Sequence, residues 1–251
     1  MSSKIVMENI FKNYGAVAAL QGVSINIKAG DVHAICGDNG AGKSTLIKVL
    51  SGVEAPESGN IRVNDRLCAF SSPTDALRSG IATIHQDLAV APRMSIFQNI
   101  FMGAELTKKV FGVTLLDKAA MRRDALGYMS QLNKSITNMN IKVEDLSGGQ
   151  RQAVAICRAL RWNADIVILD EPTAALGVRE TEQVLELIRS LKKAGKTIIL
   201  ISHAMKDVVA VADRVSVLMR GKNQIDLDTA NLTADALSHY ILSGDTEPQV
   251  A

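Results

Sequence analysis

The sequence predicts an α/β protein built on a mostly parallel β-sheet, with an antiparallel β margin and a helical insertion. Short apolar segments rich in β-branched residues recur along the chain, with helical patterns between them. From Val32 onward the order is strand, glycine-rich turn, helix and strand, an alternation that is typical of parallel sheets. The first strands instead follow one another through tight turns such as Lys28–Asp31, which predicts the antiparallel margin.

The expected elements follow from these patterns. The strands are Ile5–Ile10, Val23–Ile27, Val32–Cys36, Ile61–Val63, Ile81–Ile84, Ile166–Leu169, Thr197–Ile201 and Val215–Met219. The helices are Ser44–Leu50, Asp117–Asn133, Ser147 to about Trp162, Val178–Lys193 and Met205–Ala212. Asp117 is suited to be an N-cap because its carboxylate can accept N–H groups of the first turn. Between about residues 96 and 163 the strand signal fades, so we expect the helical insertion there.

Composition excludes several classes of protein. Lys and Arg number 28 against 26 Asp and Glu, so no global charge would draw the chain to nucleic acid or an anionic membrane. The longest unbroken apolar runs are five residues, against about 20 for a transmembrane helix. No secretory signal precedes Ile5. We therefore expect a cytosolic chain, with its three cysteines as reduced core thiols and its single tryptophan, Trp162, in the core.

The segment Gly37–Ser44 fits the P-loop pattern G-x-x-x-x-G-K-[ST]. It lies between an expected strand and an expected helix, which is the context that the motif requires. Backbone N–H groups of such a loop surround a phosphate, Lys43 reaches the β- and γ-phosphate oxygens, and the Ser44 hydroxyl ligates Mg²⁺. The expected nucleotide-binding residues of this loop are Gly37, Asn39, Gly40, Ala41, Gly42, Lys43, Ser44 and Thr45.

Two carboxylates follow the apolar strand Ile166–Leu169, in the form of a Walker B strand. We expect Asp170 to hold the Mg²⁺ shell. Glu171 points the other way along the extended backbone and is placed to polarise an attacking water. Acidic residues also end strands as helix caps, but a P-loop in the same chain weakens that alternative.

The segment Leu146–Gln150 begins a helix with Ser147 as its N-cap. Each of its two glycines costs the helix about 1 kcal/mol relative to alanine, so a role other than capping is expected. Free N–H groups at a helix start bind anions. The sequence therefore predicts a second phosphate-binding site at Ser147, Gly148, Gly149 and Gln150.

A P-loop, the pentapeptide L-S-G-G-Q and a Walker B strand, in this order, resemble the ATPase subunit of an ATP-binding cassette (ABC) transporter. The resemblance implies ATP and Mg²⁺ as cofactors and a P-loop fold of the ABC type. It further implies that Gln86 joins the γ-phosphate and Mg²⁺ to the helical part and to the membrane partner. His203 would contact the γ-phosphate and hold the catalytic base, and Tyr14 would stack on adenine. Their alternative interpretations are a loop amide, a helix cap and a half-buried aromatic residue.

The resemblance also implies a single nucleotide-binding domain over residues 1–251. Its core lobe would hold about residues 1–95 and 164–251, and its helical signature lobe about residues 96–163. One position departs from the family. Gly177 stands where the family usually has an aspartate that crosses the dimer interface.

Residues 73–76, 80–88 and 173–178 resemble the single-cassette ATPases of bacterial importers of ribose, xylose, galactose or fructose. Such a protein would form a homodimer on ATP binding and lie peripherally at the cytoplasmic face of the inner membrane. Its partners would be integral membrane permease subunits and, indirectly, an extracytoplasmic sugar-binding protein, with no nucleic acid. Alternatives are import of a non-sugar solute, or a soluble cassette protein acting on DNA or ribosomes. A P-loop GTPase or kinase is disfavoured because no N-K-x-D motif is present.

Overall fold

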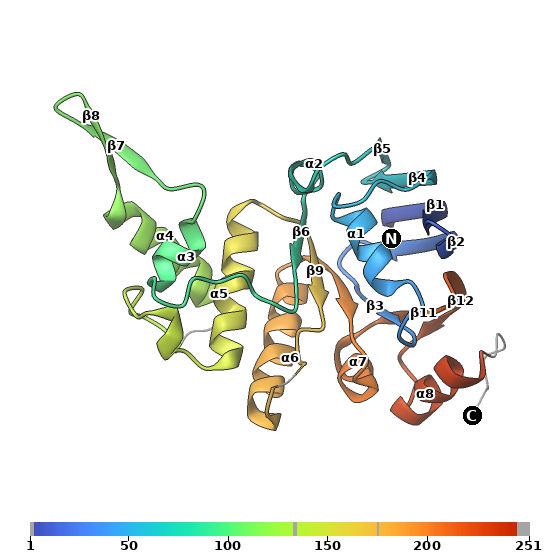
Figure 1. Cartoon of the computed structure of the whole chain (residues 1–251). Coiled ribbons are helices and arrows are strands. Elements are labelled where there is room, and N and C mark those ends of the chain that lie inside the picture. Colours follow the sequence, from blue (N-terminus) through green and yellow to red (C-terminus); the bar gives the residue numbers. More distant parts are fainter. Residues whose placement is uncertain (1–2, 133–134, 175, 245–251) are drawn as a thin grey trace.

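The computed structural model describes residues 3–132, 135–174 and 176–244 (Figure 1). Its strands are β1 (Ser3–Tyr14), β2 (Val17–Lys28), β3 (Val32–Cys36), β4 (Ser58–Val63), β5 (Arg66–Cys68), β6 (Ile81–Ile84), β7 (Thr107–Val110), β8 (Val113–Leu116), β9 (Ile166–Asp170), β10 (Thr197–Ile201), β11 (Arg214–Met219) and β12 (Lys222–Asp228). Its helices are α1 (Lys43–Leu50), α2 (Pro73–Arg78), α3 (Ile96–Phe101), α4 (Lys118–Leu132), α5 (Gly148–Arg161), α6 (Val178–Lys193), α7 (Met205–Val211) and α8 (Ala234–Ser243), with a 3₁₀ turn, η1, at Val143–Asp145. Over these ranges, no helix combines the length and apolar character needed to cross a membrane.

The central sheet has six strands in the order β12-β11-β3-β10-β9-β6. Neighbouring strands from β11 to β6 run parallel, and β12 pairs antiparallel with β11. The prediction of an α/β fold with a mostly parallel sheet is therefore confirmed. Helices including α5 and α6 cover one face, and α1 with the antiparallel sheet covers the other, so strands β3 and β10 are buried along their whole length.

The central strands separate two buried apolar clusters. In β10, Ile198 and Leu200 belong to the cluster shared with α5 and α6, whereas Ile199 and Ile201 belong to the cluster shared with α1 and the antiparallel sheet. Successive side chains point to opposite faces of a strand, so one short strand contributes to both clusters. Burying each such side chain stabilises the fold by roughly 1.5–3 kcal/mol.

The antiparallel margin is a four-stranded sheet with the order β2-β1-β4-β5. One detail of the prediction was wrong, because Lys28–Asp31 does not join neighbouring strands. It leads from β2 in this sheet to β3 in the central sheet, and the N–H of Gly30 donates to the Thr197 hydroxyl at the start of β10. Buried residues alternate in the second half of β2, whereas β3 is buried throughout. This change of pattern marks the change of sheet.

The chain between β6 and β9 holds α3, α4 and α5, as expected for the helical insertion (Figure 1). The predicted cap of α4 is present, since the Ala120 N–H donates to Asp117 Oδ1 at 3.1 Å; residue 133 of the predicted helix lies outside the described ranges. The sequence interpretation missed the hairpin of β7 and β8, which turns at Phe111 and Gly112 and projects beyond α4. Its four-residue strands are exposed, so they lack the half-buried alternation by which a strand is recognised.

Two further side chains lie outside the core that the sequence predicted. Trp162 is 44% exposed, and its ring lies 4.2 Å from the Arg161 guanidinium. Cys68 is half-buried, whereas Cys36 and Cys157 are buried, and all three are free thiols. Trp162 ends α5 at the surface, so the indole is available for contact with another molecule.

Candidate active site

The P-loop joins the carboxyl end of β3 to α1. Gly37 has φ 149°, and a Cβ there would lie 2.2 Å from the carbonyl oxygen of Leu218, so only glycine fits. The Lys43 ammonium donates to the carbonyl oxygens of Gly37 at 2.6 Å and of Asp38 at 2.9 Å. The Lys43 ammonium therefore contacts the opposite side of the P-loop, beside the start of α1. The helix dipole favours an anion at the same place.

The second part of the site lies at the end of β9. Asp170 is the last residue of this strand, and burial raises the pKa of its carboxyl while the His85 imidazole opposes the shift. Glu171 follows with φ 50°, a left-handed conformation that ends the strand, and its N–H donates to the Ile201 carbonyl at 2.9 Å. Oε2 of Glu171 lies 2.8 Å from Nδ1 of His203.

A cavity of about 370 Å³ brings these segments together. It is lined by Val17, Ala18, Ala19, Asn39, Gly40, Gly42, Lys43, Ser44, Thr45, Gln86, Asp170, Glu171 and Ile201. The P-loop, Gln86 and both carboxylates thus meet at the carboxyl ends of β3, β6 and β9, where open α/β sheets bind their ligands.

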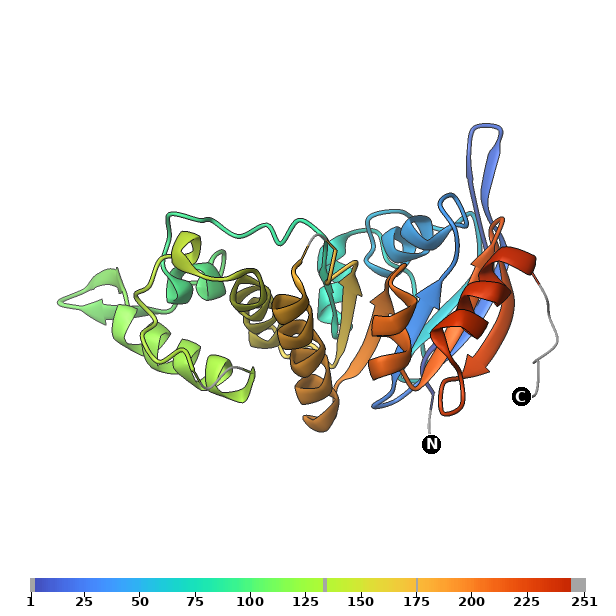
Figure 2. The ribbon, with the colours of Figure 1, turned by 90° about the horizontal axis from the view of Figure 1, so that it is seen from below.

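Besides the signature segment, four residues expected at the nucleotide lie outside this lining, namely Gly37 and Ala41 of the P-loop, His203 and Tyr14. His203 contacts Glu171 from a second cavity, which Glu171 also lines. Tyr14 is 40% exposed near the end of the hairpin that β1 and β2 form, and that hairpin extends away from the sheets in Figure 2. Its ring faces the Lys12 ammonium at 5.6 Å. Sequence reasoning also passed over Val17–Ala19, apolar residues that carry no chemical signal of their own.

The start of α5 has the cap that the sequence predicts. The Gln150 N–H donates to Ser147 Oγ at 3.3 Å, and the Ser147 N–H donates to Gln150 Oε1 at 3.0 Å. The N–H of Gly148 is not free, however, because it donates to Glu180 Oε1 at 2.9 Å. The Gly148 N–H is therefore paired within the chain, and the role of this residue at a phosphate stays a prediction.

The two glycines of L-S-G-G-Q also allow a close approach of α6. A Cβ on Gly148 would lie 2.8 Å from Leu176 Cδ2, and one on Gly149 would lie 2.6 Å from Gln183 Oε1. A larger residue at either position would require the Leu176 or Gln183 side chain to move, independently of any phosphate. Ser147, Gly148, Gly149 and Gln150 do not line the cavity at the P-loop of their own chain.

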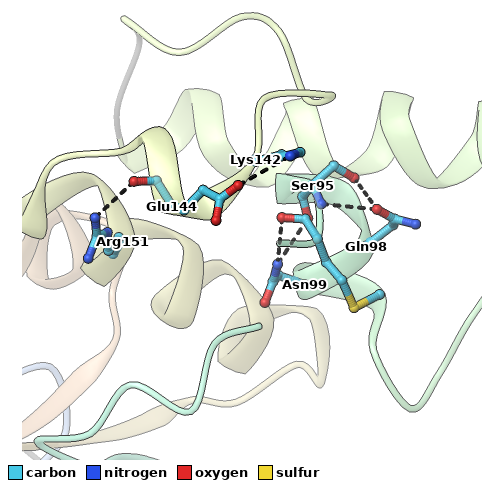
Figure 3. Close-up of polar contacts among 7 residues, drawn as sticks. Ser95, Gln98, Asn99, Lys142, Glu144 and Arg151 are labelled. Atoms are coloured by element: carbon cyan, nitrogen blue, oxygen red, sulfur yellow. Dashed lines mark hydrogen bonds and ion pairs between the residues drawn. The ribbon is translucent and has the colours of Figure 1, made fainter. Parts of the chain in front are cut away.

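Hydrogen bonds connect the segment after Gln86 to the residues before Ser147. The amide of Asn99 donates to the carbonyls of Ala91, Met94 and Ser95. The Arg151 guanidinium donates to the carbonyl of Glu144 (Figure 3). It also donates to the carbonyl of Leu146. Between these two clusters, the N–H groups of Val143 and Glu144 donate to the carbonyls of Met94 and Pro92, so the two segments lie side by side.

A further link from the Gln86 segment to α5 had no sequence signal. The Arg158 guanidinium donates to the carbonyl oxygens of Leu88 at 3.0 Å and Ala89 at 2.8 Å. Ala89 has φ 47°, so the loop is strained where the guanidinium holds it. The helix that begins with L-S-G-G-Q is thus bonded at its far end to the loop that carries Gln86.

A family model described as "ABC transporter" matches residues 20–174, which include the P-loop, L-S-G-G-Q and the Walker B strand. The chain belongs to the ABC transporter family. As an ABC cassette it binds nucleotide and is an ATPase.

Curated members of the ABC transporter family cover most of the chain. It is 47% identical over 222 residues to the xylose/arabinose import ATP-binding protein XylG of Sulfolobus acidocaldarius, covering 88% of this chain and 87% of the relative. It is 41% identical over 249 residues to the fructose import ATP-binding protein FrcA of Rhizobium meliloti, covering 97% of this chain and 95% of the relative. These two relatives thus extend over nearly the same length as the ABC cassette described here.

Solved ABC cassettes have the same fold. The ADP conformation of MJ1267, an ATP-binding cassette of an ABC transporter, aligns with TM-score 0.81 and 26% identity over 96% of each chain. The dimeric structure of MJ0796, a bacterial ABC transporter cassette, aligns with TM-score 0.72 and 26% identity, covering 91% of this chain and 100% of that one.

Proposed function

We propose that this chain hydrolyses ATP at the interface of a head-to-tail homodimer and thereby drives uptake of a simple sugar through a separate membrane permease. The observation that carries the proposal is the single cavity that holds the P-loop, Gln86, Asp170 and Glu171. The names of the relatives, which are import ATP-binding proteins for xylose, arabinose and fructose, supply the direction of transport and the class of solute.

Within this proposal, residues of the P-loop bind the phosphates of ATP. Lys43 exchanges its contacts with the Gly37 and Asp38 carbonyls for phosphate oxygens, and N–H groups at the start of α1 add further donors. The carboxylate of Glu171 accepts a proton from the attacking water. His203 fixes the orientation of that carboxylate through its 2.8 Å contact. Tyr14 stacks on adenine at the rim of the site.

The residues present fit Mg²⁺. Ser44, Gln86 and Asp170 offer a hydroxyl, an amide and a carboxylate oxygen in one cavity, and such hard oxygen ligands suit this ion. In the described ranges no group of three His, Cys, Asp or Glu side chains gathers as a metal site. This agrees with Mg²⁺, which takes one or two carboxylates together with substrate phosphates. When bound, the ion would neutralise charge that develops on the phosphates during their transfer.

The dimer follows from the position of the signature residues. Ser147 and Gly149 lie apart from the P-loop cavity of their own chain, so a γ-phosphate bound there needs them from a second copy. A two-fold, head-to-tail pair supplies both sites at once. We infer one nucleotide-binding domain over residues 1–251, with the core lobe at about 1–95 and 164–251 and the helical signature lobe at about 96–163.

A groove beside the Gln86 loop is suited to the permease. A cavity of about 260 Å³ lies between α2 and α5, with Leu77, His85, Arg158 and the exposed Trp162 among its lining residues. A permease segment in this groove would contact the loop that carries Gln86. The chain would then lie peripherally at the cytoplasmic face of the inner membrane, with the sugar-binding protein on the far side and no nucleic acid bound.

Reconstitution tests the function as a whole. The chain is combined in proteoliposomes with a permease that it binds and with that permease's sugar-binding protein, in the presence of xylose, arabinose, fructose or ribose. ATP-dependent accumulation of one sugar, abolished by Glu171→Gln, is the expected result. Lack of uptake with every sugar, together with ATPase activity stimulated by DNA or ribosomes, would refute the proposal. Isolated protein should bind none of these sugars in calorimetry.

A further inference from the structure

One carboxylate contacts the beginnings of two helices next to the proposed dimer interface. Glu180 lies in the first turn of α6, and its Oε2 accepts from the N–H of Gly177, the N-cap residue of that helix, at 3.4 Å. Its Oε1 accepts from the N–H of Gly148, the first residue of α5, at 2.9 Å. The bond from Gly148 has the length of a charge-assisted hydrogen bond, whereas the contact with Gly177 is longer and weaker.

The contact decides which donors of the signature motif remain available. Gly148 donates to Glu180, and Gln150 donates to the hydroxyl of Ser147. The N–H of Gly149 has no hydrogen-bond partner in the described part of the chain. The Gly149 N–H and the Ser147 hydroxyl are thus left for the phosphate of a partner, and Glu180 fixes the helix that presents them.

The contact of Glu180 with Gly177 connects it to the segment that follows the catalytic carboxylate of Glu171. After Glu171 the chain turns, because the Ala174 N–H donates to the Glu171 carbonyl at 3.2 Å. Beyond residue 175, which lies outside the described ranges, the Leu176 N–H donates to the Thr173 carbonyl at 3.3 Å. Leu176 is also packed against Gly148, because a Cβ on that glycine would lie 2.8 Å from its Cδ2. The turn that begins at Glu171 therefore ends on the signature helix.

We propose that Glu180 is a positioning residue that couples the two ATP sites of the dimer. It ties the turn after Glu171, which belongs to one site, to the signature helix, which serves the other. The family's usual interface aspartate is absent at Gly177, and a carboxylate three residues further on supplies an intrachain connection instead. The inference rests on the head-to-tail dimer proposed above.

Three substitutions separate the hydrogen bond from the charge. Glu180→Ala removes both contacts. Glu180→Gln keeps an acceptor oxygen for the Gly148 N–H, and Glu180→Asp keeps the charge but withdraws the carboxylate by one methylene. The matched control is Glu186→Gln on the same helix, because Glu186 pairs with Arg189 at the surface and its side chain is 66% exposed.

The readouts are the Hill coefficient for ATP hydrolysis and the ATP concentration that dimerises each protein in a Glu171→Gln background. Glu180→Ala and Glu180→Asp should bring the Hill coefficient close to 1 and raise the dimerising ATP concentration about tenfold, within the usual range of coupling between sites. In Glu180→Gln and Glu186→Gln, the dimerising ATP concentration should stay within about twofold of that of the parent, which is a small change in coupling. Binding of a fluorescent ATP analogue to the monomer should not change in any of them.

The outcomes distinguish this inference from the proposed function. If the parent dimerises and is cooperative, and both Glu180→Ala and Glu180→Asp behave as the parent does, the role proposed for Glu180 is wrong while the dimer stands. A loss of coupling matched by an equal loss of monomer nucleotide binding would do the same, because it would indicate general disruption. A parent protein that hydrolyses ATP without dimerising would overturn the dimer and this inference together. If Glu180→Ala fails to fold, the contrast between Glu180→Asp and Glu180→Gln decides.

Discussion

Nδ1 of His203 lies 2.8 Å from Oε2 of Glu171, and Glu171 is held in a left-handed backbone conformation by the bond from its N–H to Ile201. Side chain and backbone are thus both fixed where the strand β9 ends. A catalytic base needs this kind of preorganisation, because its proton acceptor must already face the water that attacks.

The first prediction concerns Glu171 itself. In Glu171→Gln the amide keeps the shape of the side chain but cannot take a proton, so kcat should fall by about 10²- to 10⁴-fold while MgATP binding changes little. Lys43→Ala is the contrasting variant and should lose ATP binding. Steady-state hydrolysis and equilibrium nucleotide binding check both. Near wild-type hydrolysis by Glu171→Gln would show that another group is the base.

The second prediction tests whether the signature motif acts on a partner's nucleotide. Lys43→Ala disables the P-loop, and Ser147→Arg places a bulky cation at the start of α5; each variant alone should be inactive. In a mixture, every heterodimer has one site with both lesions and one intact site. About a quarter of wild-type ATPase activity should return on random pairing, because half of the dimers are mixed. Background activity despite proven heterodimers would support action within one chain.

The third prediction concerns Arg158, which holds the Leu88 and Ala89 carbonyls from α5. Arg158→Lys keeps the charge but loses the fork that binds two oxygens, so the free energy of unfolding should fall by about 1–3 kcal/mol. Arg123→Lys is the matched control, since Arg123 is an exposed residue of α4 that pairs with its neighbour Asp124. Urea unfolding measures both. Equal stability of the two variants would show that the bonds to the loop contribute nothing.

The fourth prediction concerns pH. His33 is buried with Nε2 2.7 Å from Ser216 Oγ, and burial lowers its pKa from 6.5 to about 4. The unfolded chain therefore binds a proton at a pH where the folded chain does not. The contribution of His33 to stability should be fully present above pH 6.5 and should be lost as the pH drops through 4, a loss of about 3 kcal/mol for this shift.

The His33 contribution is isolated by comparison with His33→Gln, whose amide can still bond Ser216. Urea unfolding at pH 7 and pH 4.5 should show a smaller loss for the variant than for the wild type. Parallel losses in both proteins would assign the acid sensitivity to carboxylates instead.

The site residues that belong to short sequence motifs could be predicted from the sequence. Lys43 and Asp170 belong to short motifs whose residue order already implies strand, loop and helix, so their meeting in one cavity follows from a parallel sheet. The contacts of Arg158 with Leu88 and of Glu180 with Gly148 join residues 70 and 32 positions apart. Neither arginine nor glutamate on a helix signals such a partner, since both residue types are usual on solvated faces.

The errors in the fold have a related origin. Lys28–Asp31 has the composition of a hairpin turn, but whether a turn joins neighbours or leads to another sheet depends on the burial of the next strand. Trp162 was expected in the core on its size alone, and the end of α5 leaves it exposed beside Arg161. Local composition cannot show which end of a helix reaches the surface.

The hairpin of β7 and β8 gives experimental access to the motions of this ATPase. Phe111 at its tip is fully exposed, and within the hairpin only Val110 is half-buried. A fluorophore attached to a Phe111→Cys variant would therefore move with the helical insertion without disturbing either buried cluster. Paired with a second label on the central sheet, it would report in real time whether the distance between the insertion and the sheet changes when nucleotide binds and phosphate leaves.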